Sequence, residues 1–223
     1  MFVGNSMVKK VVTADQDNSI IEIREKLALH KIRHIPVVSD ESRLIGIVTD
    51  RDIRSAMPSN LAKGCDLDEE TLAGIKIKDF MTRDVVTISM MDTIQDALLL
   101  FQQKKVGALP VVDEKGILQG IVSVRDLLQS FINVLGIGEP GVLLGIVVEE
   151  KLGQLKKIVD AITEENVSLG SILVARYWEE NKRAVFTYLL TNNPARIKKK
   201  LERLGYTLIN PMDWCLDHDA PGE

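Results

Sequence analysis

Two short motifs in the sequence place a carboxylate three residues after a hydroxyl. Thr49 precedes Asp52 and Ser123 precedes Asp126, and each hydroxyl directly follows a Gly-Ile-Val run. A hydroxyl where a strand turns into a helix lies beside unpaired backbone N–H groups and the positive end of the helix dipole, which favours a phosphate group. The same spacing also describes a helix cap, which needs no ligand. The two interpretations are compatible, because the hydroxyl can cap the helix while the site is empty.

The two motifs belong to an internal repeat. A shift of 74 positions places residues 34–38 on residues 108–112 and residues 46–52 on residues 120–126. A repeat at a fixed offset usually marks a supersecondary unit that cannot bury its apolar face alone. Two packed copies predict a shared core and a pseudo-twofold cleft between them, and we expect the functional site in that cleft.

Basic residues distinguish the two copies. Residues 31–34 read Lys-Ile-Arg-His, whereas residues 105–108 read Lys-Val-Gly-Ala, and Arg51 and Arg125 occur at matching positions. Because phosphate requires positive charge, we expect one well-formed phosphate-binding cleft near the first basic segment. The second cleft is expected to be weaker or to take a less charged ligand. The alternative is that the first segment is simply exposed at a helix end that favours cations.

Each copy is predicted to fold as strand, helix, strand, strand, helix. In the first copy, a strand at residues 11–13 precedes a helix capped by Ser19, and residues 35–38 and 44–49 form a hairpin before a helix that starts at Arg51. The second copy repeats this order at the same offset, with Thr93 as the first cap. The third element of each copy, a short apolar strand, carries a proline that cannot donate to a strand ladder.

After a glycine-rich break at residues 136–141, the pattern changes to strand, helix, strand, strand, helix, strand. This order is the ferredoxin-like split βαββαβ motif. The second helix of this part is predicted to have Asn193 as its cap, Pro194 at its first position and Gly205 as its stop. The fold class is therefore α/β (α+β). The expected domains are repeat 1 at residues 1–56, a connecting loop at 57–75, repeat 2 at 76–135, the ferredoxin-like domain at 141–210 and a tail at 211–223.

The repeat unit resembles the CBS domain through three motifs: Met-x-x-x-Val-Val-Thr, Ile/Leu-Pro-Val-Val and Gly-Ile-Val-Thr/Ser-x-Arg-Asp. The segment at residues 141–210 resembles an ACT domain, with Leu152-Gly153-Gln154-Leu155 where such domains commonly have Pro-Gly-x-Leu. The whole layout is similar to that of the bacterial acetoin-utilisation CBS–ACT proteins. The resemblance implies a CBS pair followed by an ACT domain, with a possible link to acetoin or acetyl-unit metabolism.

CBS pairs bind adenosine-containing ligands such as AMP, ADP, ATP or S-adenosylmethionine between their repeats, and the resemblance implies the same here. It implies that Asp52 or Asp126 accepts hydrogen bonds from the ribose hydroxyls. The implied nucleotide-binding residues are Thr13, Lys31, Arg33, His34, Ile35, Pro36, Thr49, Arg51, Asp52, Thr87, Leu109, Pro110, Ser123, Arg125 and Asp126. For the prolines and threonines a purely structural role stays open.

ACT domains bind small ligands at the start of their first helix, usually across a dimer interface. The residues implied here are Glu150, Leu152, Gly153, Gln154 and Leu155. Free N–H groups at a helix start suit a carboxylate, but Glu149 and Glu150 would repel one. A pure dimerisation module is the alternative.

The totals fit a protein with a proper core and exclude some classes of partner. The chain has 223 residues, 45% hydrophobic, with a formal charge of -4, whereas nucleic-acid binding normally requires a basic face. Neither a signal peptide nor a membrane-spanning run is recognisable, and Cys65 and Cys215 have no metal or redox spacing. We therefore expect a cytoplasmic protein without nucleic-acid or membrane partners.

The sequence shows no nucleophile with a base, no P-loop and no Rossmann glycine pattern, so we expect no enzyme activity and no catalytic cofactor. His30 and His34 are four residues apart, but a helix is expected to end between them and no further ligand lies at suitable spacing, so we expect no metal. The leading interpretation is a regulatory sensor of an adenine nucleotide, a homodimer that acts on an enzyme partner. The alternative is a nucleotide-independent dimerisation scaffold.

Overall fold

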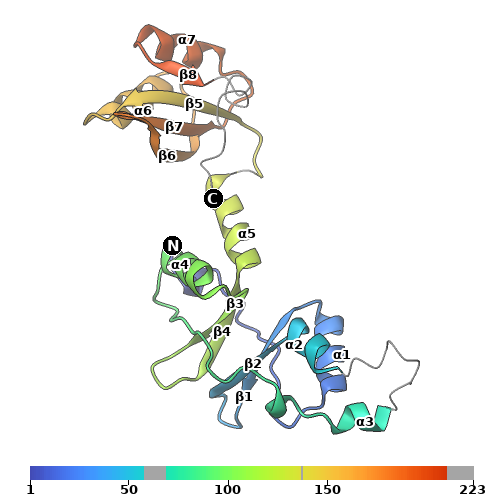
Figure 1. Ribbon diagram of the computed structural model, residues 1–223. Helices are drawn as coiled ribbons and strands as arrows, with labels where there is room; N and C mark the ends of the chain where they lie inside the picture. Colours follow the sequence, from blue (N-terminus) through green and yellow to red (C-terminus); the bar gives the residue numbers. More distant parts are fainter. Residues whose placement is uncertain (58–68, 137, 210–223) are drawn as a thin grey trace. The chain divides into compact units, whose positions relative to one another are not determined.

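The computed structural model describes residues 1–57, 69–136 and 138–209, which belong to two compact units. The first unit comprises Met1–Leu128 and the second begins at Gln129 (Figure 1). The division falls inside helix α5 (Val124–Leu135), upstream of the glycine-rich segment. Residues 210–223, including Trp214, and most of the predicted connecting loop lie outside the described residues.

The first unit contains both copies of the repeat. The first copy provides 3-10 helix η1 (Val3–Asn5), α1 (Ile20–His30), β1 (His34–Val38), β2 (Leu44–Thr49), α2 (Asp50–Ala56) and α3 (Glu69–Gly74). The second copy provides 3-10 helix η3 (Ile77–Asp79), α4 (Ile94–Lys104), β3 (Ala108–Val112), β4 (Leu118–Ser123) and α5. The other four α-helices, the hairpins and their order are as predicted, with shifts of one residue where bounds were predicted, whereas α3 lies in the segment predicted as a connecting loop.

The predicted first strand of each copy is wrong. Residues 11–13 and 85–87 form no ladder, and only single parallel bridges, Ala14 to Val37 and Ile88 to Val111, follow them. The Ala14 N–H donates to the Pro36 carbonyl and the Ala14 carbonyl accepts from Val38. One paired residue does not make a strand, so the β-branched runs predicted more order than the neighbouring backbone can support.

Capping boxes fix where the helices begin. Ser19 and Glu22 form one at α1, and Thr93 and Asp96 form the equivalent one at α4, as predicted. At the other end of α1, Lys31 adopts the left-handed conformation with φ of 52°. The helix therefore ends between His30 and His34, as expected.

The opening segment of each copy packs into the core of the other copy. Val3 and Met7 join the cluster of the second copy around Phe101 and Leu109, whereas Ile77 and Met81 join the first-copy cluster. Single antiparallel bridges accompany this exchange, from Val8 to Ile121 on β4 and from Thr82 to Ile47 on β2. The core of each copy is thus completed by residues from the other copy.

The two hairpins bring their first residues opposite the motif hydroxyls. β1 pairs with β2 and β3 with β4, both antiparallel, so His34 lies opposite Thr49 and Ala108 lies opposite Ser123. The Leu44 N–H donates to the Gly116 carbonyl, and the Leu118 N–H to the Ser42 carbonyl, which links the two hairpins. The hairpins thereby hold both helix starts, and the hydroxyls beside them, in defined positions.

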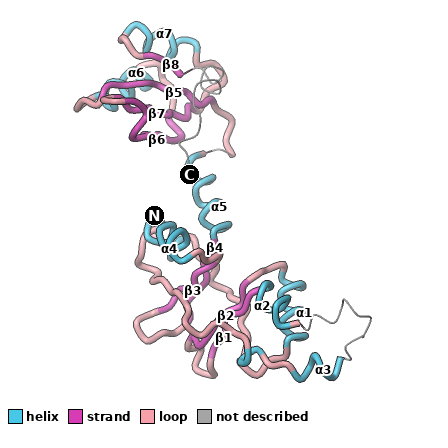
Figure 2. The backbone as a smooth tube through the Cα atoms, in the orientation of Figure 1, coloured by secondary structure: helices cyan, strands magenta, loops and turns pink. Residues whose placement is uncertain are grey.

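The second unit has the predicted βαββαβ order (Figure 2). Its elements are β5 (Val142–Glu149), α6 (Gln154–Thr163), β6 (Leu169–Glu179), β7 (Lys182–Leu189), α7 (Ala195–Arg203) and β8 (Thr207–Ile209). The strands form one antiparallel sheet in the order β6-β7-β5-β8, which is the arrangement of the ferredoxin-like motif. Alternate residues of β5, such as Leu144 and Ile146, pack with Ile158 of α6 and Leu201 of α7. That this unit is an ACT domain stays a prediction.

Helix α7 begins slightly later than predicted. Pro194 occupies the cap position, while the Asn193 side chain accepts a hydrogen bond of 3.2 Å from the Ala195 N–H. The helix ends before Gly205, whose φ of +86° is the left-handed conformation that glycine adopts readily. The residue types at both ends were therefore indicated correctly, with the start displaced by one position.

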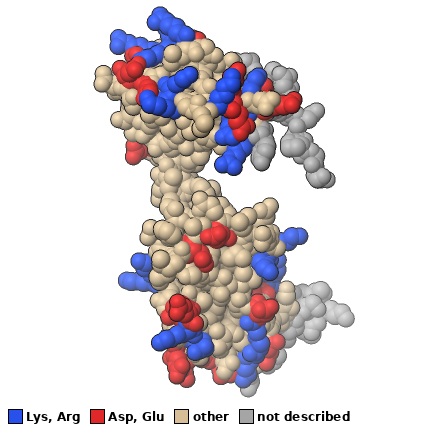
Figure 3. Space-filling view, turned by 90° about the vertical axis from the view of Figure 1, so that its left-hand side faces the viewer, with Lys and Arg blue, Asp and Glu red and all other residues tan. Residues whose placement is uncertain are grey.

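Charges of both signs are interspersed over each unit on the face that Figure 3 shows. Among the described residues, no helix combines the length and the apolar character that crossing a membrane requires.

Candidate functional site

A cavity of about 590 Å³ opens in the first unit beside the start of α2. It lies between the end of the first hairpin and two segments of the second copy, so both copies contribute to it. The residues that line it are Arg33, His34, Ile47, Thr49, Asp50, Arg51, Asp52, Arg54, Thr82, Asp84, Val85, Val86, Lys105, Val106, Gly107 and Ala108.

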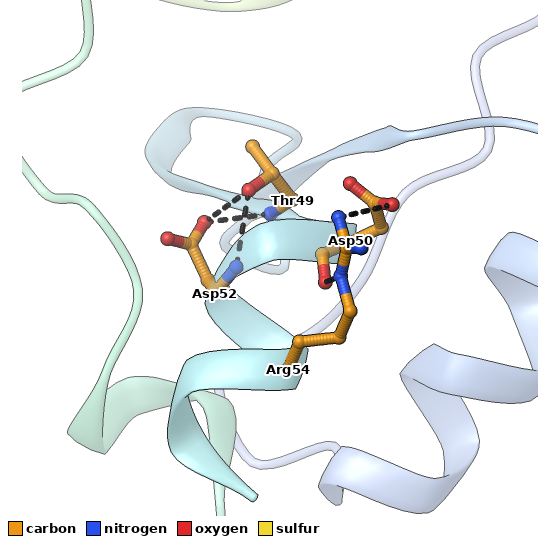
Figure 4. A network of polar contacts seen from close by, with 4 residues as sticks. All are labelled: Thr49, Asp50, Asp52 and Arg54. Atoms are coloured by element: carbon orange, nitrogen blue, oxygen red, sulfur yellow. Dashed lines mark hydrogen bonds and ion pairs between the residues drawn. The ribbon is translucent and has the colours of Figure 1, made fainter.

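Thr49 and Asp52 form a capping box at the N-terminus of α2 (Figure 4). One carboxylate oxygen, Oδ2 of Asp52, accepts from the Thr49 N–H at 2.8 Å and from the Thr49 hydroxyl at 2.7 Å. The Thr49 hydroxyl oxygen accepts in turn from the Asp52 N–H at 3.3 Å. In Figure 4 the other carboxylate oxygen of Asp52 points away from these bonds. The cap thus occupies one oxygen of Asp52 and leaves the second available as an acceptor.

The second copy has the same geometry at the start of α5. Asp126 Oδ2 accepts from the Ser123 N–H at 2.8 Å and from the Ser123 hydroxyl at 2.6 Å. The Ser123 oxygen accepts from the Asp126 N–H at 3.3 Å. Both predicted motifs are therefore helix caps in the ligand-free molecule, which is one of the two interpretations left open by their spacing.

Cations approach the cavity from both copies. Arg54 is paired with Asp50, with 3.1 Å between its terminal nitrogen and the carboxylate oxygen, and this exposed pair contributes little to stability. Arg33, Arg51 and Lys105 form no ion pair within the described part of the chain. Their charges are therefore available to an anion in the cavity.

His34 also lines the cavity. It faces Thr49 across the hairpin, and its Nε2 would lie only 3.0 Å from a Cβ atom built on Gly107. Burial lowers the pKa of His34 below its usual value, because the charged imidazolium would lose hydration. Asp50 and Asp52 act in the opposite direction without overcoming this effect.

The structure brings five of the predicted nucleotide-binding residues together around the cavity: Arg33, His34, Thr49, Arg51 and Asp52. The predicted residues outside its lining are Thr13, Lys31, Ile35, Pro36, Thr87, Leu109, Pro110, Ser123, Arg125 and Asp126. Ile35 and Leu109 are completely buried in the two apolar cores. The carbonyls of Pro36 and Pro110 accept backbone hydrogen bonds from Ala14 and Ile88.

Several lining residues were not among the predicted binding residues, notably Asp84, Val85 and Lys105. The repeat alone does not indicate them, because the positions that match them at the offset of 74 (Lys10, Val11 and Lys31) do not line the cavity. Lys105 occupies the position that matches Lys31 at the offset of 74. A cleft between the two copies is therefore lined by one set of positions in the first copy and by a different set of positions in the second.

The predicted ligand residues of the second unit lie around the start of α6. Glu150 is ion-paired with Arg183, Leu152 is fully exposed, and Gly153 caps the helix with φ of 85° and no side-chain bond. Gln154 accepts a hydrogen bond of 2.8 Å from the Tyr206 hydroxyl and lines a cavity of about 620 Å³. This cavity also includes Lys157 and Lys182, whereas Glu150, Leu152, Gly153 and Leu155 are not part of its lining.

Comparison with known proteins agrees with the duplicated architecture. The family model described as "CBS domain" matches twice, at residues 3–59 and 77–133. The chain belongs to the CBS domain family. A CBS domain-containing protein of Dictyostelium discoideum is 35% identical over 136 residues, which cover 60% of this chain and 94% of that protein.

Two solved structures of CBS proteins with bound ligands are similar to this chain. The CBS domain pair of protein MJ0100, in complex with 5'-methylthioadenosine and S-adenosyl-L-methionine, is 27% identical with a TM-score of 0.50, and covers 59% of this chain and 95% of its own. CBSX2 in complex with AMP is 27% identical with a TM-score of 0.51, and covers 59% of this chain and 96% of its own.

Some CBS relatives are larger enzymes. A homoserine O-acetyltransferase of Methanococcus vannielii is 30% identical over 125 residues, which cover 56% of this chain but 24% of that enzyme. The chain thus spans about a quarter of that relative's length.

Proposed function

We propose that the first unit is a regulatory, non-catalytic sensor that binds an adenosine-containing ligand in the cavity beside α2. The observation that supports this most is the second oxygen of Asp52, which faces away from the cap (Figure 4). The same cavity is lined by three cations that have no ion-pair partner among the described residues. Similar CBS pairs bind AMP, S-adenosyl-L-methionine and 5'-methylthioadenosine.

Each group in the cavity has a chemical task in this proposal. The free oxygen of Asp52 accepts hydrogen bonds from the ribose hydroxyls, while the N–H and hydroxyl of Thr49 hold the carboxylate in place. Arg33, Arg51 and Lys105 supply the positive charge that a phosphate requires. The apolar side chains of Val85, Val86 and Val106 offer surface for the adenine ring.

Isothermal titration of AMP and S-adenosylmethionine into the Asp52→Asn variant tests the proposal. An asparagine side chain keeps one oxygen for the cap but replaces the other by an amide that donates. A hydrogen bond to a charged group contributes about 1.5–3 kcal/mol, so we expect binding to weaken roughly 10- to 100-fold. Asp96→Asn is the matched control, because Asp96 forms the same capping box at α4 but does not line the cavity.

Equal losses in the two variants would mean that the effect comes from the caps, and would contradict the ribose assignment. A loss confined to Asp126→Asn would place the ligand in the second cleft. No heat with either ligand in the unmodified protein would favour the nucleotide-independent scaffold.

We further propose that the second unit is an ACT domain that serves dimerisation or binds a small ligand, and that ligand binding in the first unit regulates an enzyme partner. The ferredoxin-like strand order supports the ACT assignment. The cytoplasmic location, the homodimer and the link to acetoin metabolism stay predictions from the sequence and its resemblance. Sedimentation of the purified chain with and without AMP tests the homodimer.

A further inference from the structure

His34 lines the cavity, and the contacts proposed above give its imidazole no task. It lies opposite Thr49 in the β1–β2 ladder, and side chains at directly opposed positions of a ladder have Cβ atoms only about 5 Å apart. In the second copy the same position, opposite Ser123, is occupied by Ala108. The duplication has therefore placed an imidazole beside one of two otherwise equivalent helix starts.

The neighbour of His34 across the pseudo-twofold axis leaves room for it. An ideal Cβ on Gly107 would lie 3.0 Å from His34 Nε2 and 3.1 Å from Cε1, which is tighter than ordinary side-chain contacts. Gly107 itself has no left-handed conformation that would explain a glycine there. The glycine thus permits the imidazole to lie along the cavity wall.

The charges around His34 come from every element of the cavity. β1 and the residue before it provide His34 and Arg33, and α2 provides Asp50, Arg51, Asp52 and Arg54. The second copy contributes Asp84 and Lys105. Arg54 is already paired with Asp50. The other cations of the lining, Arg33, Arg51 and Lys105, are therefore available to a bound phosphate together with the imidazole.

We propose that His34 determines specificity for phosphorylated ligands, because its imidazole takes up a proton when a phosphate group enters the cavity. The identity of the ligand rests on the proposed function. In the free protein, burial lowers the pKa of the imidazole and so disfavours its charged form. A phosphate dianion within a few ångströms favours the imidazolium and raises the pKa in the complex.

The direction of the pH effect follows from this linkage. Because the pKa is higher in the complex than in the free protein, the additional affinity is fully present below the free-protein pKa. It is lost as the pH rises through the pKa of the complex. Each unit of difference corresponds to about a tenfold change in affinity.

Two measurements test the inference. The first is an NMR-detected pH titration of the His34 imidazole, free and with AMP or inorganic pyrophosphate, with the signal assigned by its loss in His34→Ala. The second compares AMP affinity at about pH 6 and about pH 8. Because the phosphate of AMP also titrates near about 6, the readout is the ratio in the unmodified protein divided by that in His34→Ala.

We expect the His34 pKa to rise with either probe. The ratio of AMP affinity at about pH 6 to that at about pH 8 should be up to about tenfold larger in the unmodified protein than in His34→Ala. His30→Ala, which removes an exposed histidine outside the cavity lining, should leave that ratio unchanged. Gly107→Ala keeps the imidazole but displaces it, and should reduce the ratio. This second variant shows whether the position of the imidazole matters when His34→Ala alters the fold.

The outcomes separate the inference from the proposed function. AMP binding without a change in the His34 pKa would overturn the inference and leave the proposed function intact. A rise with pyrophosphate in a protein that does not bind AMP would support the inference and contradict the nucleotide assignment. No change with either probe and no AMP binding would overturn both.

Discussion

Hydroxyl and carboxylate pairs begin four helices of the first unit, and the pairs differ in their surroundings rather than in their chemistry. Thr49 with Asp52 and Thr93 with Asp96 make nearly identical bonds, with hydroxyl-to-carboxylate distances of 2.7 and 2.6 Å. Only the first of these two pairs lines the cavity. A ligand role therefore depends on where the fold places a cap, while the cap itself can be recognised from four residues.

The half-buried imidazole of His34 makes the stability of the free protein depend on pH. Its folded-state pKa lies below the ordinary value of 6.5, so the unfolded state binds the proton more readily. The stability that neutral His34 provides is fully present above about pH 6.5 and is lost as the pH falls through the folded-state pKa.

We therefore expect thermal denaturation between about pH 7.5 and 5.5 to show a smaller fall in melting temperature for His34→Ala than for the unmodified protein. The readout is the slope, so a uniform loss of stability in the variant does not obscure it. His30→Ala should follow the unmodified protein. Parallel slopes for His34→Ala and the unmodified protein would contradict this, because they would show that protonation of His34 does not destabilise the folded protein.

At the level of secondary structure, local signals predicted what local bonds determine. The capping boxes at Ser19 and Thr93 and the two hairpins depend on residues close in sequence, so the elements could be read directly. The exchange of opening segments could not, because the pairing of Thr82 with Ile47 joins residues that are far apart in the chain. The same long-range pairing belongs to the segment that puts Val85 into the cavity, which explains why this residue was missed as part of the first cleft.

Gly141, the residue before β5 of the second unit, offers a direct test of packing. A Cβ on Gly141 would lie 2.5 Å from the Leu189 carbonyl oxygen and 2.8 Å from the Tyr188 ring, so Gly141→Ala must displace backbone. We expect a loss of about 1–3 kcal/mol in the free energy of unfolding. Urea unfolding followed by tryptophan fluorescence measures it, because both tryptophans of the chain, Trp178 and Trp214, come after the start of the second unit at Gln129.

Gly138→Ala is the matched control, since no atom lies within 4 Å of the position that a Cβ would take there. We expect this change to be neutral or slightly stabilising, because alanine reduces the freedom of the unfolded chain. An equal loss in both variants would contradict the close approach of Gly141 to β7.

For the molecule as a whole, the two units differ in how directly their function can be inferred. The first unit belongs to a family whose ligand-bound members are similar to it in sequence and fold. The second unit has a ferredoxin-like sheet, which by itself does not specify a ligand. Such a sensor would bind its ligand in the first unit. The ligand could shift the protein from one conformation to another only by as much as its affinities for the two conformations differ.

Hydrogen–deuterium exchange with and without AMP tests whether the nucleotide binds between the repeats, since it reports on every segment of the intact chain at once. We expect slower exchange at the start of α2 and in the neighbouring segments at residues 82–86 and 105–108, and this protection should disappear in Asp52→Asn. Protection that leaves these three segments unchanged, or that occurs only around α6, would contradict a nucleotide site between the repeats.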